Sequence, residues 1–235
     1  MYYFHNSKTR YYFNIINRIT SLDIFFIKIM QWILNYGTSN IFENDKEILN
    51  LLNMFSNNVP FSGKDIDNKE IEVFKNKNPD LLMENTPINS GTIAIIYRGV
   101  YKEKKVIIKI KRKNIKEDIE KSISFFNFLI YFINFIPKLK HAKLDKILQE
   151  NSKNLINQVD FNKEANNISK FYKFYNDNDS IHTPFLYEDL CNENIIVMEY
   201  LDGVNIQDFK KKNDSDKRSQ LPYDFFLFSM FNHNI

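Results

Sequence analysis

The sequence predicts an α+β fold in which a β-hairpin and a later strand are combined with long helices. One observation is the change in residue type after Pro87, where residues 88–112 are rich in β-branched side chains and contain two glycines. The other is the helical spacing of apolar residues on both sides of that segment. A small sheet is therefore expected between two groups of helices.

Helices are predicted before the sheet. Residues 13–35 carry apolar side chains on most turns, and residues 45–55 and 64–75 repeat the pattern over shorter lengths. Pro60 lies in a predicted loop, and Pro79 ends the third helix.

The predicted hairpin consists of strands at residues 92–101 and 106–112, joined by a polar turn at residues 102–105. Two helices follow, at residues 115–136 and 143–175, separated by Pro137, and the second carries apolar residues at helical spacing.

After these helices, a strand at residues 194–200 leads into a turn at residues 201–203. Residues 210–220 are a solvated loop or a frayed helix, and residues 223–235 begin another apolar helix.

Composition excludes several classes of protein. With 43% hydrophobic and 15% aromatic residues, the 235-residue chain can form a packed core and is not a disordered protein. The net charge of +3 gives no argument for nucleic-acid binding. One cysteine excludes an internal disulfide, and no His/Cys cluster suggests a metal site.

Two segments raise the question of a membrane. The apolar run at residues 125–136 is shorter than the roughly 18–20 residues that span a bilayer, so it is a buried helix or a helix on a membrane surface. Residues 1–22 carry basic but no acidic side chains, as transit peptides do, although they are rich in Tyr and Phe. A membrane-associated place in a mitochondrion or plastid is one expectation, and the cytoplasm is the alternative.

Three features together suggest a nucleotide-binding lobe. Such a lobe needs a small-residue turn near the phosphates, a strand lysine that holds them and a helix acid that orients the lysine. Lys109 lies in the second strand, and Glu164 lies on or beside the apolar face of the long helix. The candidate turn consists of Asn89, Ser90, Gly91 and Thr92.

Each feature also has an ordinary structural explanation. Lys109 alternates with Lys111, so both could face solvent. Glu164 could be a boundary residue beside an apolar stripe, and the Ser-Gly turn could be only a turn.

Short motifs distinguish between these readings. The chain has KIMQ at residues 28–31, PINSGTIAII at 87–96, VIIK at 106–109, QVDFNKEA at 158–165 and MEYLDG at 198–203. Their order and spacing resemble the K-x-G-Q motif, alanine-rich stretch, V-A-V-K strand, E-x-D-F-x-x-E-A helix and M-E-x-x-x-G hinge of one family. The chain is thereby similar to the UbiB/AarF (ABC-one) family of atypical protein-kinase-like ATPases.

The resemblance implies a protein-kinase-like small lobe at residues 86–202. It also implies a helical N-terminal extension at residues 1–85 and the start of an incomplete C-terminal lobe at residues 203–235. The family's H-x-D-x-H-P-G-N catalytic loop and D-F-G aspartate do not occur in the 235 residues, so a truncation before the catalytic loop is expected.

The resemblance also implies roles for single residues. Lys109 and Glu164 would be catalytic, with Lys109 holding the phosphates of ATP. Other ATP contacts would come from Asn89, Ser90, Gly91 and Thr92 over the phosphates and from the backbone of Glu199, Tyr200 and Leu201 at the adenine. Lys28, Gln31, Gln158 and Asp160 would belong to the family-specific extension, in which Lys28 approaches Asp160. Gln158 and Met30 depart from the family's glutamate and glycine.

The function expected from the resemblance is that of an ATP-binding, kinase-like protein related to isoprenoid-quinone or lipid homeostasis, inactive as this chain stands. A complete homologue would use ATP with Mg²⁺. Expected partners are nucleotide and, further, a lipid surface or quinone-biosynthesis proteins, but no nucleic acid. The alternatives are a non-catalytic pseudokinase and a helix-rich interaction module at a membrane surface.

Overall fold

The computed structural model describes residues 59–133, 144–179 and 181–203, together with residues 26–28 and the single positions Tyr11, Asn14 and Arg18. The predicted helices at residues 45–55 and 223–235, the charged segment 210–220 and most of residues 13–35 lie outside the described residues.

A five-stranded antiparallel sheet is the centre of the described fold. The strands are β1 Leu81–Met83, β2 Asn89–Ser90, β3 Ala94–Tyr101, β4 Lys104–Lys111 and β5 Ile195–Glu199. Strands β3 and β4 pair along their full length, β5 lies beside β4, and both β1 and β2 pair with β3. The predicted α+β class, the hairpin and the last strand are confirmed, whereas β1 and β2 were not predicted as strands.

The hairpin turn is tighter than the sequence predicted. Lys102 and Glu103 have positive φ angles of 48° and 65°, the signature of a two-residue turn whose twist matches that of the strands. Lys104 and Lys105 therefore belong to β4 and not to the turn.

Two capped pieces replace the helix predicted at residues 64–75. A short 3₁₀ turn, η1 Gly63–Asp65, is closed by Ser62 and Asp65, which cap each other's backbone N–H groups. Helix α4 Asn68–Lys77 then begins at Asp67, whose carboxylate accepts the Glu70 N–H at 3.2 Å.

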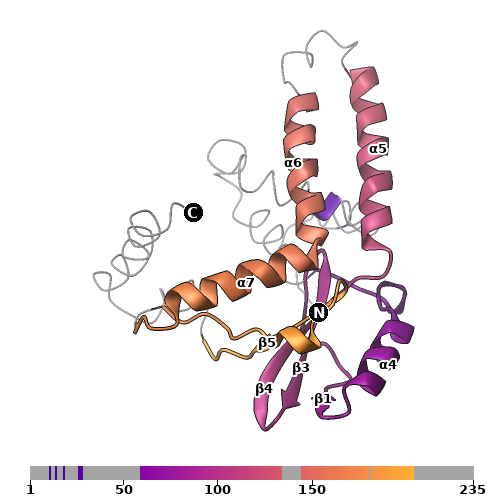
Figure 1. Ribbon diagram of the computed structural model, residues 1–235. Coiled ribbons are helices and arrows are strands. Elements are labelled where there is room, and N and C mark those ends of the chain that lie inside the picture. Colours follow the sequence, from indigo (N-terminus) through magenta and orange to yellow (C-terminus); the bar gives the residue numbers. More distant parts are fainter. Residues whose placement is uncertain are drawn as a thin grey trace.

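Three long helices pack on the face of the sheet opposite to α4. They are α5 Ile115–Ile133, α6 Leu144–Val159 and α7 Phe161–Tyr175, followed by the 3₁₀ turn η3 Glu188–Leu190. Helices α5 and α6 run side by side away from the sheet, while α7 turns and runs across it (Figure 1). The single helix predicted at residues 143–175 is therefore wrong, because Asp160 breaks it and caps the start of α7.

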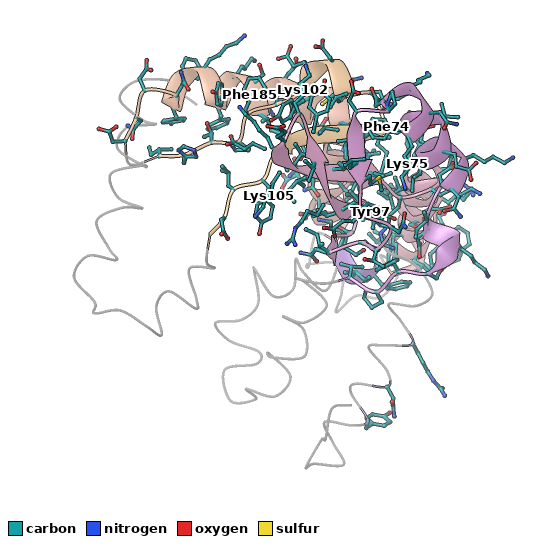
Figure 2. All side chains as sticks on the ribbon, turned by 90° about the horizontal axis from the view of Figure 1, so that it is seen from below. Phe74, Lys75, Tyr97, Lys102, Lys105 and Phe185 are labelled. Atoms are coloured by element: carbon teal, nitrogen blue, oxygen red, sulfur yellow. The ribbon has the colours of Figure 1, made fainter. Side chains whose placement is uncertain are left out.

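The sheet separates two hydrophobic cores. On one face, Phe74 of α4 packs with Tyr97 of β3 (Figure 2). The same core includes the alternate β4 residues Val106, Ile108 and Ile110. On the other face, the helices α5, α6 and α7 bury a core that includes Ile119, Leu155, Phe161 and Ile196. Because strand side chains alternate, Lys109 and Lys111 lie on the face covered by α7.

The apolar run of α5 is not uniformly buried. Phe126 and Ile130 pack against the core, but Phe125, Phe128 and Tyr131 are exposed. The buried-helix interpretation therefore holds for only one face of this helix. No helix in the described ranges is both long and apolar enough to cross a membrane.

Gly99 is a sensitive position in the sheet, and we predict that Gly99→Ala destabilises the fold. A Cβ there would lie 2.7 Å from the Leu82 carbonyl oxygen and 2.9 Å from Ile108 Cδ1, so β1 or the core must shift. Overpacking of this kind costs about 1–3 kcal/mol of unfolding free energy. Urea unfolding followed by circular dichroism measures it.

Gly91→Ala is the matched control, because its Cβ would meet only the Ala94 carbonyl oxygen at 3.6 Å and its φ is not positive. This change should leave stability unchanged or raise it by about 0.4–1 kcal/mol through the unfolded state. Equal destabilisation by both substitutions would contradict the packing described for Gly99.

Candidate functional site

Lys109 of β4 and Glu164 of α7 form an ion pair. Lys109 Nζ lies 2.5 Å from Glu164 Oε1, and the two side chains are 24% and 32% exposed. Lys109 Nζ also lies 5.2 Å from the centre of the Phe161 ring. Lys109 thus points toward α7, and the alternative in which it faces bulk solvent is wrong. The contact that the motifs predicted between the two residues is present.

The start of α7 sets the position of Glu164. Asp160 accepts the Lys163 N–H at 3.1 Å, and its carbonyl accepts the Glu164 N–H at 3.1 Å, so the helix begins one turn before the acid. Phe161 is buried beneath this turn and holds it against the sheet. The hydrogen bond from the Lys163 N–H lowers the pKa of Asp160, which keeps the capping carboxylate charged.

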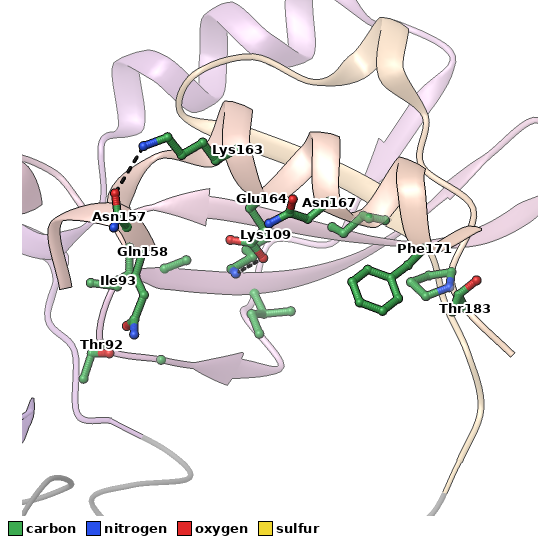
Figure 3. A pocket seen from close by; sticks show the side chains of 15 residues that line it. Thr92, Ile93, Lys109, Asn157, Gln158, Lys163, Glu164, Asn167, Phe171 and Thr183 are labelled. Carbon is green, nitrogen blue, oxygen red and sulfur yellow. Dashed lines mark hydrogen bonds and ion pairs between the residues drawn. The ribbon is translucent and has the colours of Figure 1, made fainter. Parts of the chain in front are cut away.

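An open cavity of about 1020 Å³ surrounds the ion pair. Its walls are the turn after β2, the C-terminal end of α6, the exposed side of α7 and the chain at Thr183 and Pro184 (Figure 3). The cavity is at the upper end of the size usual for small-molecule sites. A partly exposed lysine, already oriented by an acid, lies on one wall, which is an arrangement suited to an anionic ligand.

The predicted phosphate turn is shorter than expected. Gly91, Thr92 and Ile93 line the cavity, and the Gly91 N–H closes the turn on the Ala94 carbonyl at 2.8 Å. Asn89 and Ser90 form strand β2 instead and do not line the cavity. Ser90 is fully buried, and its hydroxyl accepts a hydrogen bond from the guanidinium of Arg112 at 2.7 Å.

The predicted adenine-binding segment lies away from the ion pair. Glu199 lies opposite Val106 on β4, whereas Lys109 lies opposite Ile196. Three residues of strand therefore place Glu199 about 10 Å from the position of Lys109. The Glu199 N–H donates to the Phe185 carbonyl, and the Tyr200 N–H donates to the Lys105 carbonyl. None of Glu199, Tyr200 and Leu201 lines the cavity around Lys109, and Tyr200 instead borders a separate cavity beside Arg98.

Lys28 reaches the site, although not by the predicted contact. Its Nζ donates to Gln158 Oε1 at 2.9 Å, whereas the carboxylate of Asp160 is occupied by the α7 cap and by Lys163. The expected approach of Lys28 to Asp160 is therefore replaced by a contact with Gln158. Burial lowers the pKa of Lys28, and the positive charge of Lys109 lowers it further.

Residues 26–28 pack against the helices. Phe26 meets Phe126 of α5 edge to face at 5.4 Å, and Ile27 is 3% exposed. Gln31 lies outside the described residues.

Two basic residues near the site were missed by the sequence interpretation. Arg112 follows β4 and is buried among the turns, and Lys163 lines the cavity beside Asn157, to which it donates at 3.1 Å (Figure 3). In the sequence, both stand in charged surroundings that are typical of a solvated surface. No local pattern distinguishes them from ordinary exposed lysines and arginines.

Comparison with known proteins identifies the family of the chain. A family model described as the ABC1 atypical kinase-like domain matches residues 57–235. An uncharacterized protein in the hydrogenase 1 5′ region of Clostridium pasteurianum is 33% identical over 166 residues, which are 68% of this chain and 31% of that protein. The chloroplastic ACTIVITY OF BC1 COMPLEX KINASE 1 of Arabidopsis thaliana is 30% identical over 129 residues, 52% of this chain and 19% of that protein.

A solved structure supports the fold. The complex of Rv3197 with erythromycin from Mycobacterium tuberculosis matches 65% of this chain and 40% of its own, with a TM-score of 0.52 and 14% identity. The chain spans less than a third of the length of the two curated relatives. The α+β lobe is kinase-like, and the chain belongs to the ABC1 family of atypical kinase-like proteins, the UbiB/AarF proteins, which its motifs resemble.

Proposed function

We propose that the chain binds ATP in the cavity around Lys109 and Glu164. The ion pair carries this proposal, because an acid that orients a strand lysine is the arrangement by which kinase-like proteins hold nucleotide phosphates. The turn at Gly91–Ile93 borders the same cavity and supplies backbone groups beside the lysine. The chemistry that ATP supplies is a transferable phosphoryl group, and these residues hold and orient its phosphates.

The position of the adenine follows from the same sheet. The end of β5 lies about 10 Å along the strand from Ile196, the residue opposite Lys109, and this separation suits a base and its ribose. We therefore retain the backbone of Glu199, Tyr200 and Leu201 as the proposed adenine contacts, through carbonyl oxygens or through Leu201, because the N–H groups of Glu199 and Tyr200 already donate to Phe185 and Lys105. A ligand that spans both places would extend from the cavity toward the C-terminal end of β5.

Magnesium belongs to the proposal only in a complete homologue. Among the described residues, no group of three or more His, Cys, Asp or Glu side chains could hold a metal ion. The acid nearest the proposed phosphates, Glu164, is already paired with Lys109.

The wider role proposed is in isoprenoid-quinone or lipid homeostasis, at a membrane of a mitochondrion or plastid. Membership of the ABC1 family supports it, as does the relative from Arabidopsis thaliana that is named chloroplastic. The proposed partners are the nucleotide and, further, a lipid surface or proteins of quinone biosynthesis. A pseudokinase would share the nucleotide site and differ in lacking hydrolysis.

We predict weak binding of ATP to residues 1–235. The short turn offers few backbone donors, and no group of three or more His, Cys, Asp or Glu side chains lies among the described residues to hold Mg²⁺. The dissociation constant should therefore be in the high micromolar range or above, a binding free energy of about −5.5 kcal/mol or weaker. Thermal unfolding with increasing ATP measures it, with GTP as the control for the base. A nanomolar dissociation constant would contradict this account of the site.

A second candidate function rests on the outer face of α5. Phe125, Phe128, Tyr131 and Phe132 are all more than half exposed, and the rings of Phe128 and Tyr131 both contact that of Phe132. Such an aromatic face suits an interaction module at a membrane surface. Binding to vesicles of anionic lipid that is independent of ATP, and is lost in Phe128→Ser, would favour this function over the first.

A further inference from the structure

Arg112 is a buried cation with several partners. Only 3% of its side chain is exposed, and its Nη1 lies 3.3 Å from Asp65 Oδ1. Burying a charge is costly unless it is paired and hydrogen-bonded. The guanidinium meets this condition, since Nη2 donates to Ser90 Oγ at 2.7 Å and to the Pro60 carbonyl at 3.1 Å.

The same residue holds the turn that borders the cavity. Its Nε donates to the Gly91 carbonyl at 3.1 Å, and its backbone N–H donates to the Ile93 carbonyl at 2.9 Å. These two bonds bracket Thr92. The turn is therefore fastened on both of its sides by a single residue that lies behind it, away from Lys109.

The segment before α4 completes the support. Val59 donates its N–H to the Ser90 carbonyl at 2.8 Å, and Lys113 donates its N–H to the Asp65 carbonyl at 2.9 Å. Asp65 is itself fixed by the capping box with Ser62. Arg112 thus connects the turn at Gly91–Ile93 to a second, independently capped turn, η1.

A turn fastened in this way has little freedom to open or close. It consists of three residues between β2 and β3, and its neighbours on both sides are hydrogen-bonded. Its backbone is therefore in place before a ligand arrives, which lowers the entropy lost on binding. This lower entropy loss strengthens the binding of only that part of a ligand that contacts the turn.

We propose that Arg112 is a positioning residue that fixes the Gly91–Ile93 turn over the cavity and so favours ligands that carry a polyphosphate. The proposal rests on the proposed function, because it assumes that the phosphates of ATP lie between this turn and Lys109. It assigns Arg112 no contact with the nucleotide.

The first test compares ATP with AMP in the 235-residue chain, by ligand-observed NMR that detects millimolar affinities. Arg112→Gln leaves buried carbonyl groups without a donor, so ATP affinity should fall about tenfold, while AMP affinity changes less than about twofold. Arg112→Lys should restore part of the ATP affinity. Asp65→Asn, which keeps the bonds from Arg112 to the turn, should have the smaller effect.

The second test measures the turn itself. Amide hydrogen exchange at residues 90–94 should become at least about tenfold faster in Arg112→Gln and in the milder Ser90→Ala, with no change in α4. Unchanged exchange would overturn the anchoring role whatever the nucleotide data show. Equal losses for ATP and AMP would overturn the polyphosphate preference. A wild-type chain that binds no nucleotide would overturn the proposed function and with it the preference, and hydrogen exchange alone would then decide the anchoring.

Discussion

Lys109→Ala is expected to lower the affinity of the chain for ATP by about 10- to 150-fold. Lys109 Nζ is the cation of the ion pair with Glu164 and lies on the wall of the cavity. A hydrogen bond to a charged group contributes about 1.5–3 kcal/mol, and every 1.4 kcal/mol is a factor of ten in affinity. Ligand-observed NMR, which detects millimolar affinities, measures the difference between the two proteins.

Lys104→Ala is the matched control for this substitution. Lys104 lies on the same strand and is exposed at the hairpin turn, far along β4 from Glu164. Its replacement should leave ATP affinity within about twofold, because distant surface charges are screened at physiological salt. Equal ATP affinity in Lys109→Ala and the wild type would show that the nucleotide does not bind at the ion pair.

Glu164→Gln separates orientation from charge. The glutamine leaves Lys109 in place but removes the carboxylate that holds its Nζ at 2.5 Å. ATP affinity should fall less than in Lys109→Ala, since the cation remains available to the phosphates. A larger loss in Glu164→Gln would mean that the acid contacts the ligand directly.

The ion pair could be predicted from the sequence because the family resemblance joined two local patterns, each of which had an ordinary structural explanation when taken alone. The VIIK strand places Lys109 in a hairpin whose pairing is set by alternation, and the helical motif places Glu164 beside an apolar stripe. Neither pattern requires knowledge of distant contacts. The resemblance to a family then joined the two residues across 55 positions of sequence.

The break between α6 and α7 could not be found in this way. Apolar residues continue at helical spacing through Val159 and Phe161, and no proline or glycine interrupts them. The break depends on Asp160, whose carboxylate competes for backbone N–H groups and begins a new helix. A capping residue inside a periodic apolar run gives a weaker signal than the run itself.

Arg112 and Ser90 escaped prediction for a different reason. Their burial comes from contacts with residues near position 60, which lie about 30 to 50 positions away. Local alternation reports which face of a strand a side chain takes, and it carries no information on what covers that face. Ser90 therefore looked like a turn residue over phosphates, whereas it is part of the anchor behind the turn.

Residues 1–235 are expected to bind ATP without catalysing phosphoryl transfer. This chemistry depends on positioning and charge, and it requires an aspartate that orients the nucleophile together with Asp and Asn ligands for Mg²⁺. Of the described acids at the site, Glu164 is paired with Lys109 and Asp160 caps α7. The later acids Asp208, Asp214, Asp216 and Asp224 lie outside the described residues, and none stands in an H-x-D-x-H-P-G-N sequence.

Single-turnover hydrolysis of ATP and autophosphorylation by the purified chain measure this directly. The expected result is no turnover above that of Lys109→Ala, with turnover gained when the catalytic-loop half of a complete relative is appended. The difference in rate between the chain alone and the chain with the appended half should be large, since removing catalytic groups that act as a unit costs several orders of magnitude in rate. Robust turnover by residues 1–235 that Lys109→Ala abolishes would contradict the prediction, because an acid other than the family's aspartates would then have to orient the nucleophile beside the ion pair.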